Sequence, residues 1–258
     1  MVRISKQNTK PKIMTKAVYN SIAQEYKDSK SLSFRKYIEE YTLFEMTGVV
    51  SGRKVVDLAC GEGFYTRKLK EANAASIVGV DISFEMILLA NKQEIANPIG
   101  CEYVLQDVAA LSKMGDFDLV TAMYLLNYAK TKEELVAFCK AAFKQLKPGG
   151  RFVGMNDNIM NDPKDYGNYR KYGFVKASTP ERKEGDPIAY TFFNEDGTEF
   201  QFNNYYLTPE TYQEAFEEAG FVNFKWEGLR LDPRQEWNSF WNDFMNKPPV
   251  IGFSAERP

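Results

Sequence analysis

The chain of 258 residues is 44% hydrophobic and 26% charged, which is typical of a soluble α/β domain with a sizeable core. Its net charge of −2 excludes a general attraction to nucleic acid or to an anionic membrane, so we expect neither as a partner. The sequence has no histidine and only three separated cysteines, which excludes imidazole bases and argues against a zinc site or a disulfide framework. We therefore expect no metal and a reducing, cytoplasmic location.

The N-terminal part is predicted to be a tail followed by two helices. Residues 1–14 are locally basic and lack the apolar stretch of a signal peptide, which favours a flexible, solvated tail. In residues 15–30, apolar side chains recur at Val18, Ile22 and Tyr26, a spacing that indicates an amphipathic helix. Residues 31–48 repeat the pattern and end at Gly48.

From residue 54 onwards, strand and helix patterns alternate. Thr131 and Glu134 form a capping box at the start of the third of these helices. The alternation predicts a parallel, doubly wound sheet with right-handed crossovers. The predicted strands are 54–59, 76–83, 101–109, 117–128 and 151–157, and the predicted helices are 65–73, 84–96 and 131–146.

The rhythm changes between residues 158 and 207, which are polar and rich in aromatic residues. Period-two alternation on both sides of Asp196-Gly197 predicts a β-hairpin, inserted after the fifth strand. Thr208 and Pro209 then begin a helix over 208–220, and two further strands are expected at 221–229 and 248–256. The fold class predicted is Rossmann-like α/β, with a mostly parallel seven-stranded sheet in one domain over residues 15–258.

The stretch "VVDLACGEG" joins the first strand to its helix through a glycine turn. Gly61 and Gly63 allow a ligand to approach the backbone closely, which a Cβ would prevent. Two glycines alone are a weak signal for a nucleotide-like ligand. Thr66 stands where the third glycine of a dinucleotide-binding fingerprint would be, so that fingerprint is incomplete.

Three acids lie at the ends of successive strands: Asp57, Asp81 and Asp107. Each alone could equally be the N-cap of the following helix. Together they suit a ligand that is rich in hydrogen-bond donors and positively charged, and they would repel a pyrophosphate.

The segments "VVDLACGEG", "VGVDIS", "QDVA", "FDLVTAMYLLNY" and "LKPGGRF" together resemble the motifs of class I S-adenosylmethionine-dependent methyltransferases. The resemblance covers about residues 54–155. It implies S-adenosyl-L-methionine as cofactor, S-adenosyl-L-homocysteine as product, and a helical lid over residues 15–50. The cofactor residues it implies are Tyr19, Tyr26, Arg35, Asp57, Ala59, Cys60, Gly61, Gly63, Asp81, Ile82, Met86, Asp107, Val108, Met123 and Tyr124.

Within that set, the resemblance implies that residues 57–63 cradle the methionine part and that Asp81 binds the ribose. Asp107 and Val108 would bind the adenine, and Met123 and Tyr124 would line the sulfonium side. Ile82 and Met86 would pack on the adenine ring or simply belong to the core. Arg35 would pair with the methionine carboxylate or be an exposed arginine.

Further segments, including "RKYGF", "YTFF" and "NNYYL", resemble the subgroup that contains the toxoflavin-pathway N-methyltransferase. This implies transfer of a methyl group to a nitrogen, rather than an oxygen, of a small heterocycle or amine in specialised metabolism. The enzyme would be a monomer or homodimer. Two alternatives remain open: a dinucleotide-dependent oxidoreductase on the same architecture, and a module that binds the cofactor without catalysis.

Without histidine, we expect catalysis mainly by positioning the acceptor. The candidate catalytic residues are Asn127, Tyr128 and Asp157, of which Asp157 could instead be a turn residue. Aromatic side chains of the insertion 158–207 could stack on a flat or cationic acceptor, or form the core of the hairpin. The candidate substrate-binding residues are Asn156, Asn158, Tyr172, Tyr190, Phe192, Tyr205 and Tyr206.

Overall fold

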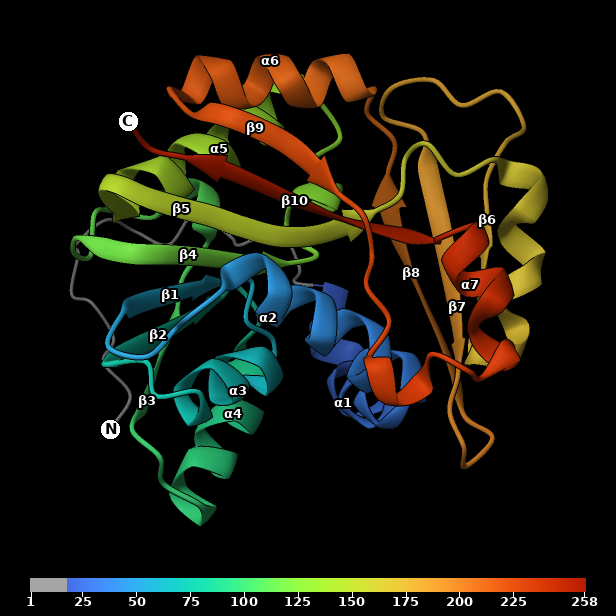
Figure 1. The fold of residues 1–258 in the computed structure, drawn as a ribbon, viewed down its shortest axis with the longest axis horizontal. Helices are drawn as coiled ribbons and strands as arrows, with labels where there is room; N and C mark the ends of the chain where they lie inside the picture. The colour runs from blue at the N-terminus through green and yellow to red at the C-terminus, as the bar shows by residue number, and fades with distance from the viewer. Residues whose placement is uncertain (1–17) are drawn as a thin grey trace.

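The computed structural model describes residues 18–258, so the predicted tail 1–14 lies outside the described residues. The predicted Rossmann-like fold is confirmed: seven strands form one sheet in the order β3-β2-β1-β4-β5-β10-β9 (Figure 1). The first five strands along the chain pair in parallel, and β10 is antiparallel to both of its neighbours. The strands are β1 (Lys54–Leu58), β2 (Ser76–Asp81), β3 (Cys101–Leu105), β4 (Phe117–Met123), β5 (Leu146–Asp157), β9 (Val222–Glu227) and β10 (Val250–Glu256).

Helices cover both faces of this sheet, as right-handed crossovers require. One face packs on α5 (Lys132–Gln145) and α6 (Pro209–Ala219). The other packs on α2 (Tyr41–Thr47), α3 (Phe64–Glu71) and α4 (Phe84–Ala96). Successive strand residues point to opposite faces, so Val56 belongs to the first core and Val55 to the second.

The segment inserted after β5 is larger than the predicted hairpin. β7 (Pro187–Phe193) and β8 (Glu199–Tyr205) form that hairpin, but β6 (Phe174–Ala177) adds a third antiparallel strand on the other side of β7. A 3₁₀ helix, η6 (Pro163–Tyr172), precedes β6. β6 was not predicted, because a strand of four residues is too short for alternation to be recognisable in the sequence.

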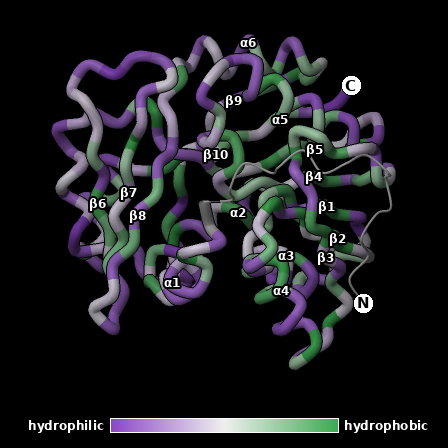
Figure 2. Tube along the Cα trace, turned by 180° about the vertical axis from the view of Figure 1, so that it is seen from behind, coloured by the Kyte–Doolittle hydropathy of each residue, from purple (hydrophilic) through white to green (hydrophobic). Residues whose placement is uncertain are grey.

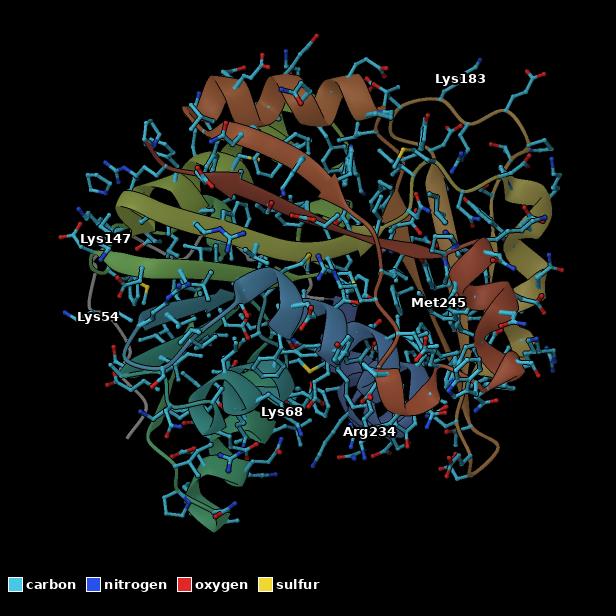
Figure 3. All side chains as sticks on the ribbon, viewed as in Figure 1. Lys54, Lys68, Lys147, Lys183, Arg234 and Met245 are labelled. Carbon is cyan, nitrogen blue, oxygen red and sulfur yellow. The ribbon has the colours of Figure 1, made fainter. Side chains whose placement is uncertain are left out.

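The inserted sheet lies beyond the carboxyl ends of the parallel strands: the arrowhead of β5 points towards it in Figure 1, and the view from behind in Figure 2 agrees. Lys54 and Lys147, labelled in Figure 3, lie at the opposite end of the sheet. The N-terminal helices α1 (Ala23–Asp28) and η3 (Arg35–Glu40, a π-helix) pack against the insertion in a third core, which is rich in aromatic residues. A ligand at the carboxyl ends of the strands therefore meets the insertion.

Two further boundaries differ from the prediction. β5 begins at Leu146 rather than at the predicted residue 151, because Leu146 already pairs with Phe117 of β4. Residues 230–247, for which no element was predicted, contain η7 (Pro233–Gln235), η8 (Ser239–Trp241) and α7 (Asn242–Asn246). Over residues 18–258, no helix has both the length and the apolar character that a bilayer crossing requires.

Candidate active site

A cavity of about 550 Å³ lies between the parallel sheet and the inserted sheet. One wall comes from the loops that follow β1 to β4, and the other from β8, α1 and the segment around η5 (Leu126–Tyr128). The lining residues are Tyr26, Ala59, Gly61, Asp81, Ile82, Met86, Asp107, Val108, Met123, Tyr124, Leu125, Tyr128, Lys130, Phe138, Gln201, Phe202, Asn203 and Tyr205. Ten of the fifteen predicted cofactor residues are in this set, together with Tyr128 and Tyr205.

Asp81 fixes the glycine loop in place. Its two carboxylate oxygens accept hydrogen bonds from the backbone N–H groups of Gly61 and Ser83, both at 2.8 Å. Burial raises the pKa of Asp81 to about 6. Asp107, across the cavity, accepts a hydrogen bond from the N–H of Ala109 at 2.9 Å, so it caps η4 (Val108–Ala110) while also lining the cavity. Asp107 is therefore an N-cap residue that also faces the cavity.

Backbone strain is concentrated at the same wall. Ala59 and Tyr124 have φ angles of 55° and 72°, in the left-handed region that side chains disfavour. Each such residue costs roughly 1–3 kcal/mol, and it persists only where the surrounding structure holds it. Both residues line the cavity. Residues strained in this way are frequent at ligand sites.

Asp57 lies behind the loop rather than in the cavity wall. Its carboxylate accepts hydrogen bonds from the hydroxyls of Thr66 at 2.7 Å and Thr121 at 2.8 Å, which ties α3 and β4 to β1. Burial raises the pKa of Asp57 to about 6.

Cys60 and Gly63 also lie outside the cavity wall. Cys60 packs against Gly79, where an added Cβ would come within 2.8 Å of the Cys60 sulfur. Burial raises the pKa of the Cys60 thiol well above its usual value, so the thiol is protonated and is not a nucleophile. The side chain of Tyr19 lies outside the described residues.

Arg35 is buried, with only 2% of its surface exposed, and its partner is Glu39. The Arg35 Nη1 atom lies 2.8 Å and 2.9 Å from the two oxygens of Glu39. Glu39, itself fully buried, also accepts hydrogen bonds from the hydroxyls of Tyr65 and Tyr124. Burial and the nearby Glu39 carboxylate raise the pKa of both tyrosines well above the usual value, so both phenols stay neutral.

Asp157 is fully buried and lies in neither cavity wall. It forms an ion pair of 2.6 Å with Lys176 of β6, which is also fully buried, and accepts a hydrogen bond from the hydroxyl of Tyr190 of β7. Burial lowers the pKa of Lys176. This network joins the end of β5 to the inserted sheet.

A second polar network runs beside it through asparagines. Asn156 accepts a hydrogen bond from the backbone N–H of Asn127 at 2.9 Å and donates one to the hydroxyl of Tyr212 at 2.6 Å. The Asn127 amide donates to the Asn204 oxygen of β8 at 2.8 Å. Asn158 donates to the Pro248 carbonyl at 2.8 Å. Asn127, Asn156 and Asn158 therefore connect elements, and none of them lines the large cavity.

The predicted aromatic residues divide between several places. Tyr205 lines the large cavity, where Lys130 Nζ lies 4.5 Å from the centre of its ring. Tyr190 and Phe192 line a smaller chamber described below. Tyr172 stacks on Trp241 with an interplanar angle of 11°, and Tyr206 lies under the guanidinium of Arg182. These last two line neither space.

Three polar residues of these networks were not predicted: Glu39, Lys176 and Asn204. Glu39 had a recognisable signal, because it lies four residues after Arg35 on a predicted helix, the spacing of an intrahelical ion pair. Lys176 and Asn204 gave no such signal, since their partners lie on other strands. Within residues 18–258, no group of three or more His, Cys, Asp or Glu side chains is arranged to hold a metal ion.

Comparison with known proteins agrees with this geometry. Residues 55–150 match the profile of a family described as "Methyltransferase domain". A ubiquinone biosynthesis O-methyltransferase from Coxiella burnetii (strain RSA 493) is 30% identical over 127 residues, 48% of this chain and 50% of that protein. A demethylmenaquinone methyltransferase from Lactococcus lactis is 31% identical over 144 residues, 53% of this chain and 55% of that protein. The chain thus spans about half the length of the curated relatives it matches.

Solved structures share the fold. An S-adenosylmethionine-dependent methyltransferase from Clostridium acetobutylicum superposes with a TM-score of 0.67 and 18% identity, covering 93% of this chain and 99% of that one. One from Mesorhizobium loti gives a TM-score of 0.60 and 21% identity, covering 83% and 95%. Residues 55–150 therefore match a methyltransferase family model, and the chain shares the fold of solved S-adenosylmethionine-dependent methyltransferases.

Proposed function

We propose that this protein transfers a methyl group from S-adenosylmethionine to a small molecule, at a nitrogen of a heterocycle or amine in preference to an oxygen. The observation that carries the proposal is the cavity of about 550 Å³, which joins the acidic end of the parallel sheet to the inserted sheet. One space thus has room for a nucleoside-like ligand and for an acceptor beside it.

The residues at the acidic end fit the cofactor. Asp81 and Asp107 would accept hydrogen bonds from ribose hydroxyls and the adenine amino group, with Ile82 and Met86 against the ring. The Gly61 backbone, already left-handed with φ 56°, would lie along the methionine part. When bound, S-adenosylmethionine supplies a methyl group that an acceptor lone pair can take by in-line displacement. Such a displacement needs the two reacting atoms about 3–3.5 Å apart, so the protein's main task is positioning.

The choice of nitrogen rests on the groups around the acceptor end. There the cavity is lined by Tyr128, Lys130, Gln201, Asn203 and Tyr205, none of which is a carboxylate or an imidazole. Asp157, the carboxylate suggested by the sequence, is paired with Lys176 away from the cavity. A neutral phenol needs its proton removed, whereas a ring nitrogen or amine offers a free lone pair. The toxoflavin-pathway resemblance supports the same choice, while the Coxiella relative is named as an O-methyltransferase.

A dinucleotide oxidoreductase is disfavoured by the sequence around the glycine turn. Thr66 stands where the third glycine of the dinucleotide fingerprint would be, and the acid at Asp57 in the first strand is unusual for that fingerprint. We further propose that residues 15–258 act as one cytoplasmic domain, monomeric or homodimeric, with 15–50 as the lid and 158–207 as the acceptor-binding insertion.

Calorimetric titration with S-adenosylhomocysteine, and separately with NADH, tests the cofactor. We expect binding of the first only. Radiolabelled S-adenosylmethionine incubated with a panel of heteroaromatic amines and catechols then tests the acceptor atom. Label transferred only to catechols would overturn the preference for nitrogen, and binding without transfer to any compound would favour a non-catalytic module.

A further inference from the structure

A second space of about 20 Å³, here called the inner chamber, lies behind the wall of the large cavity. Tyr26, Tyr124, Tyr128 and Phe202 line both spaces and therefore form the partition between them. The volume is enough for one water-sized group and too small for a ring. The other lining residues are Phe34, Arg35, Glu39, Phe174, Tyr190, Phe192, Asn204 and Val250.

The charged groups of the inner chamber leave one donor unused. Glu39 is occupied, because Arg35, Tyr65 and Tyr124 all donate to its two oxygens. The Nε atom of Arg35 is buried and has no hydrogen-bond partner among residues 18–258. An unsatisfied buried N–H is costly, and a guanidinium can only donate. The chamber therefore suits a group that accepts a hydrogen bond.

Asn204 adds a second donor to the same space. Its side-chain oxygen accepts a hydrogen bond from Asn127, which leaves its NH₂ group available. The residue is only 2% exposed, so the amide is screened from bulk water. The remaining wall is aromatic: the ring centres of Phe34 and Phe192 lie 4.8 Å and 5.3 Å from the Arg35 guanidinium carbon. Such rings hold the guanidinium in place through cation–π contacts, which leave its Nε–H group free to donate.

We propose that the inner chamber is a specificity pocket for a single carbonyl or oxyanion substituent on the ring of the methyl acceptor. The inference rests on the proposed function, since the ring itself would lie in the large cavity beside the cofactor. The substituent would pass the partition and accept hydrogen bonds from Arg35 Nε and the Asn204 amide. An ammonium substituent is rejected, because it would meet a guanidinium whose carboxylate partner is already satisfied.

The test uses three probes of similar size: benzamide, benzylamine and ethylbenzene. Each is titrated by ligand-observed NMR into the full chain loaded with S-adenosylhomocysteine, whose own affinity is measured first by calorimetry. We expect benzamide to bind at least tenfold more tightly than the other two. Equal binding of the three, or a preference for benzylamine, would overturn the inference. Failure of S-adenosylhomocysteine to bind would instead count against the proposed function, because the probes can also be titrated into the unloaded protein.

Two variants locate the preference in the chamber. Arg35→Met combined with Glu39→Gln removes both charges together and keeps an oxygen for the tyrosine hydroxyls. We expect it to abolish the preference for benzamide, measured both in the unloaded protein and with S-adenosylhomocysteine at saturating concentration. Asn204→Ala should reduce the preference by three- to tenfold and provides the test if the double variant does not fold. A preference that survives in a folded variant of either kind contradicts the assignment.

Discussion

The two walls of the large cavity are built in different ways. At the end of the parallel sheet, Asp81 ends its strand and is held by backbone N–H groups of two adjacent strand-to-helix loops, those of Gly61 and Ser83. The insertion that carries the second wall is held from behind by hydrogen bonds between residues far apart in the chain: Asn127 and Asn204 are 77 residues apart, and Asp157 and Tyr190 are 33 apart. The first wall, here called the local wall, is therefore set by the loops that follow neighbouring strands, and the position of the second wall by contacts of the inserted sheet. Four experiments test whether the two regions differ in this way.

The largest effect is expected from the ion pair that joins the two regions. Lys176→Met leaves the fully buried Asp157 without its opposite charge, which should lower the free energy of unfolding by about 3–5 kcal/mol. Chemical denaturation followed by circular dichroism measures the change. The double variant Lys176→Met/Asp157→Leu should recover most of the loss. The surface change Lys183→Met is the control and should have an effect below about 0.5 kcal/mol. A double variant as unstable as the single one would show that the unpaired charge of Asp157 does not cause the loss of stability.

Substitutions in the local wall should change the affinity for the cofactor more than the free energy of unfolding. Asp81→Ala is expected to weaken S-adenosylhomocysteine binding by about 1.5–3 kcal/mol, from the loss of charge-assisted hydrogen bonds. Calorimetry measures this, with thermal unfolding to confirm that the variant is folded. Lys176→Met, at a temperature where it is folded, should by contrast bind S-adenosylhomocysteine like the parent chain. Unchanged affinity in folded Asp81→Ala would remove the ribose assignment.

The buried carboxylate of Asp57, behind the glycine loop, predicts that the free energy of unfolding depends on pH. Burial raises the pKa of Asp57 to about 6 in the folded protein, above its value in the unfolded chain. The folded state therefore binds a proton at Asp57 more tightly than the unfolded chain does. The stabilisation that results is present at low pH and is lost as pH rises through about 6. When the pH is lowered from 7 to 5, Asp57 should raise the free energy of unfolding by about 1 kcal/mol.

Asp57→Asn should remove that gain. The measurement is the difference in unfolding free energy between the two pH values, with Asp196→Asn in the exposed turn as control. An undiminished difference in Asp57→Asn would assign the pH dependence to other groups, Asp81 first among them because its pKa is also raised to about 6.

The smallest effect is expected at the acceptor end. If positioning dominates, Tyr128→Phe keeps the ring that lines both spaces and should lower the rate of methyl transfer by less than about tenfold. Single-turnover assays with labelled S-adenosylmethionine measure the rate once an acceptor is known. A loss of 10²-fold or more, with unchanged cofactor affinity, would make the Tyr128 hydroxyl a participant in proton transfer.

The same contrast explains how far the sequence could be interpreted. The parallel sheet, its order of elements and the cavity positions of Asp81, Asp107, Ile82 and Met86 were predictable, because a strand followed by a turn leaves little freedom in where the next side chains go. Asp157 looked equivalent, since it also ends a strand. Its direction is decided by Lys176, which lies on a strand too short to be recognised. Arg35 was predicted to pair with the methionine carboxylate or to be exposed; in the structure it is buried and pairs with Glu39, one turn away.

Gly63 shows a further consequence for how such a chain can change. Its φ of 86° already favours glycine, but a Cβ there would also lie only 2.3 Å from the hydroxyl and 2.8 Å from the nearest ring carbon of Tyr103 on β3. The requirement for glycine at position 63 thus comes from its contact with Tyr103 of β3, on the side of the turn away from the ligand. Substitutions at 63 and 103 should then be correlated among related sequences, and the turn and β3 should evolve as one unit even in a descendant that no longer binds a cofactor.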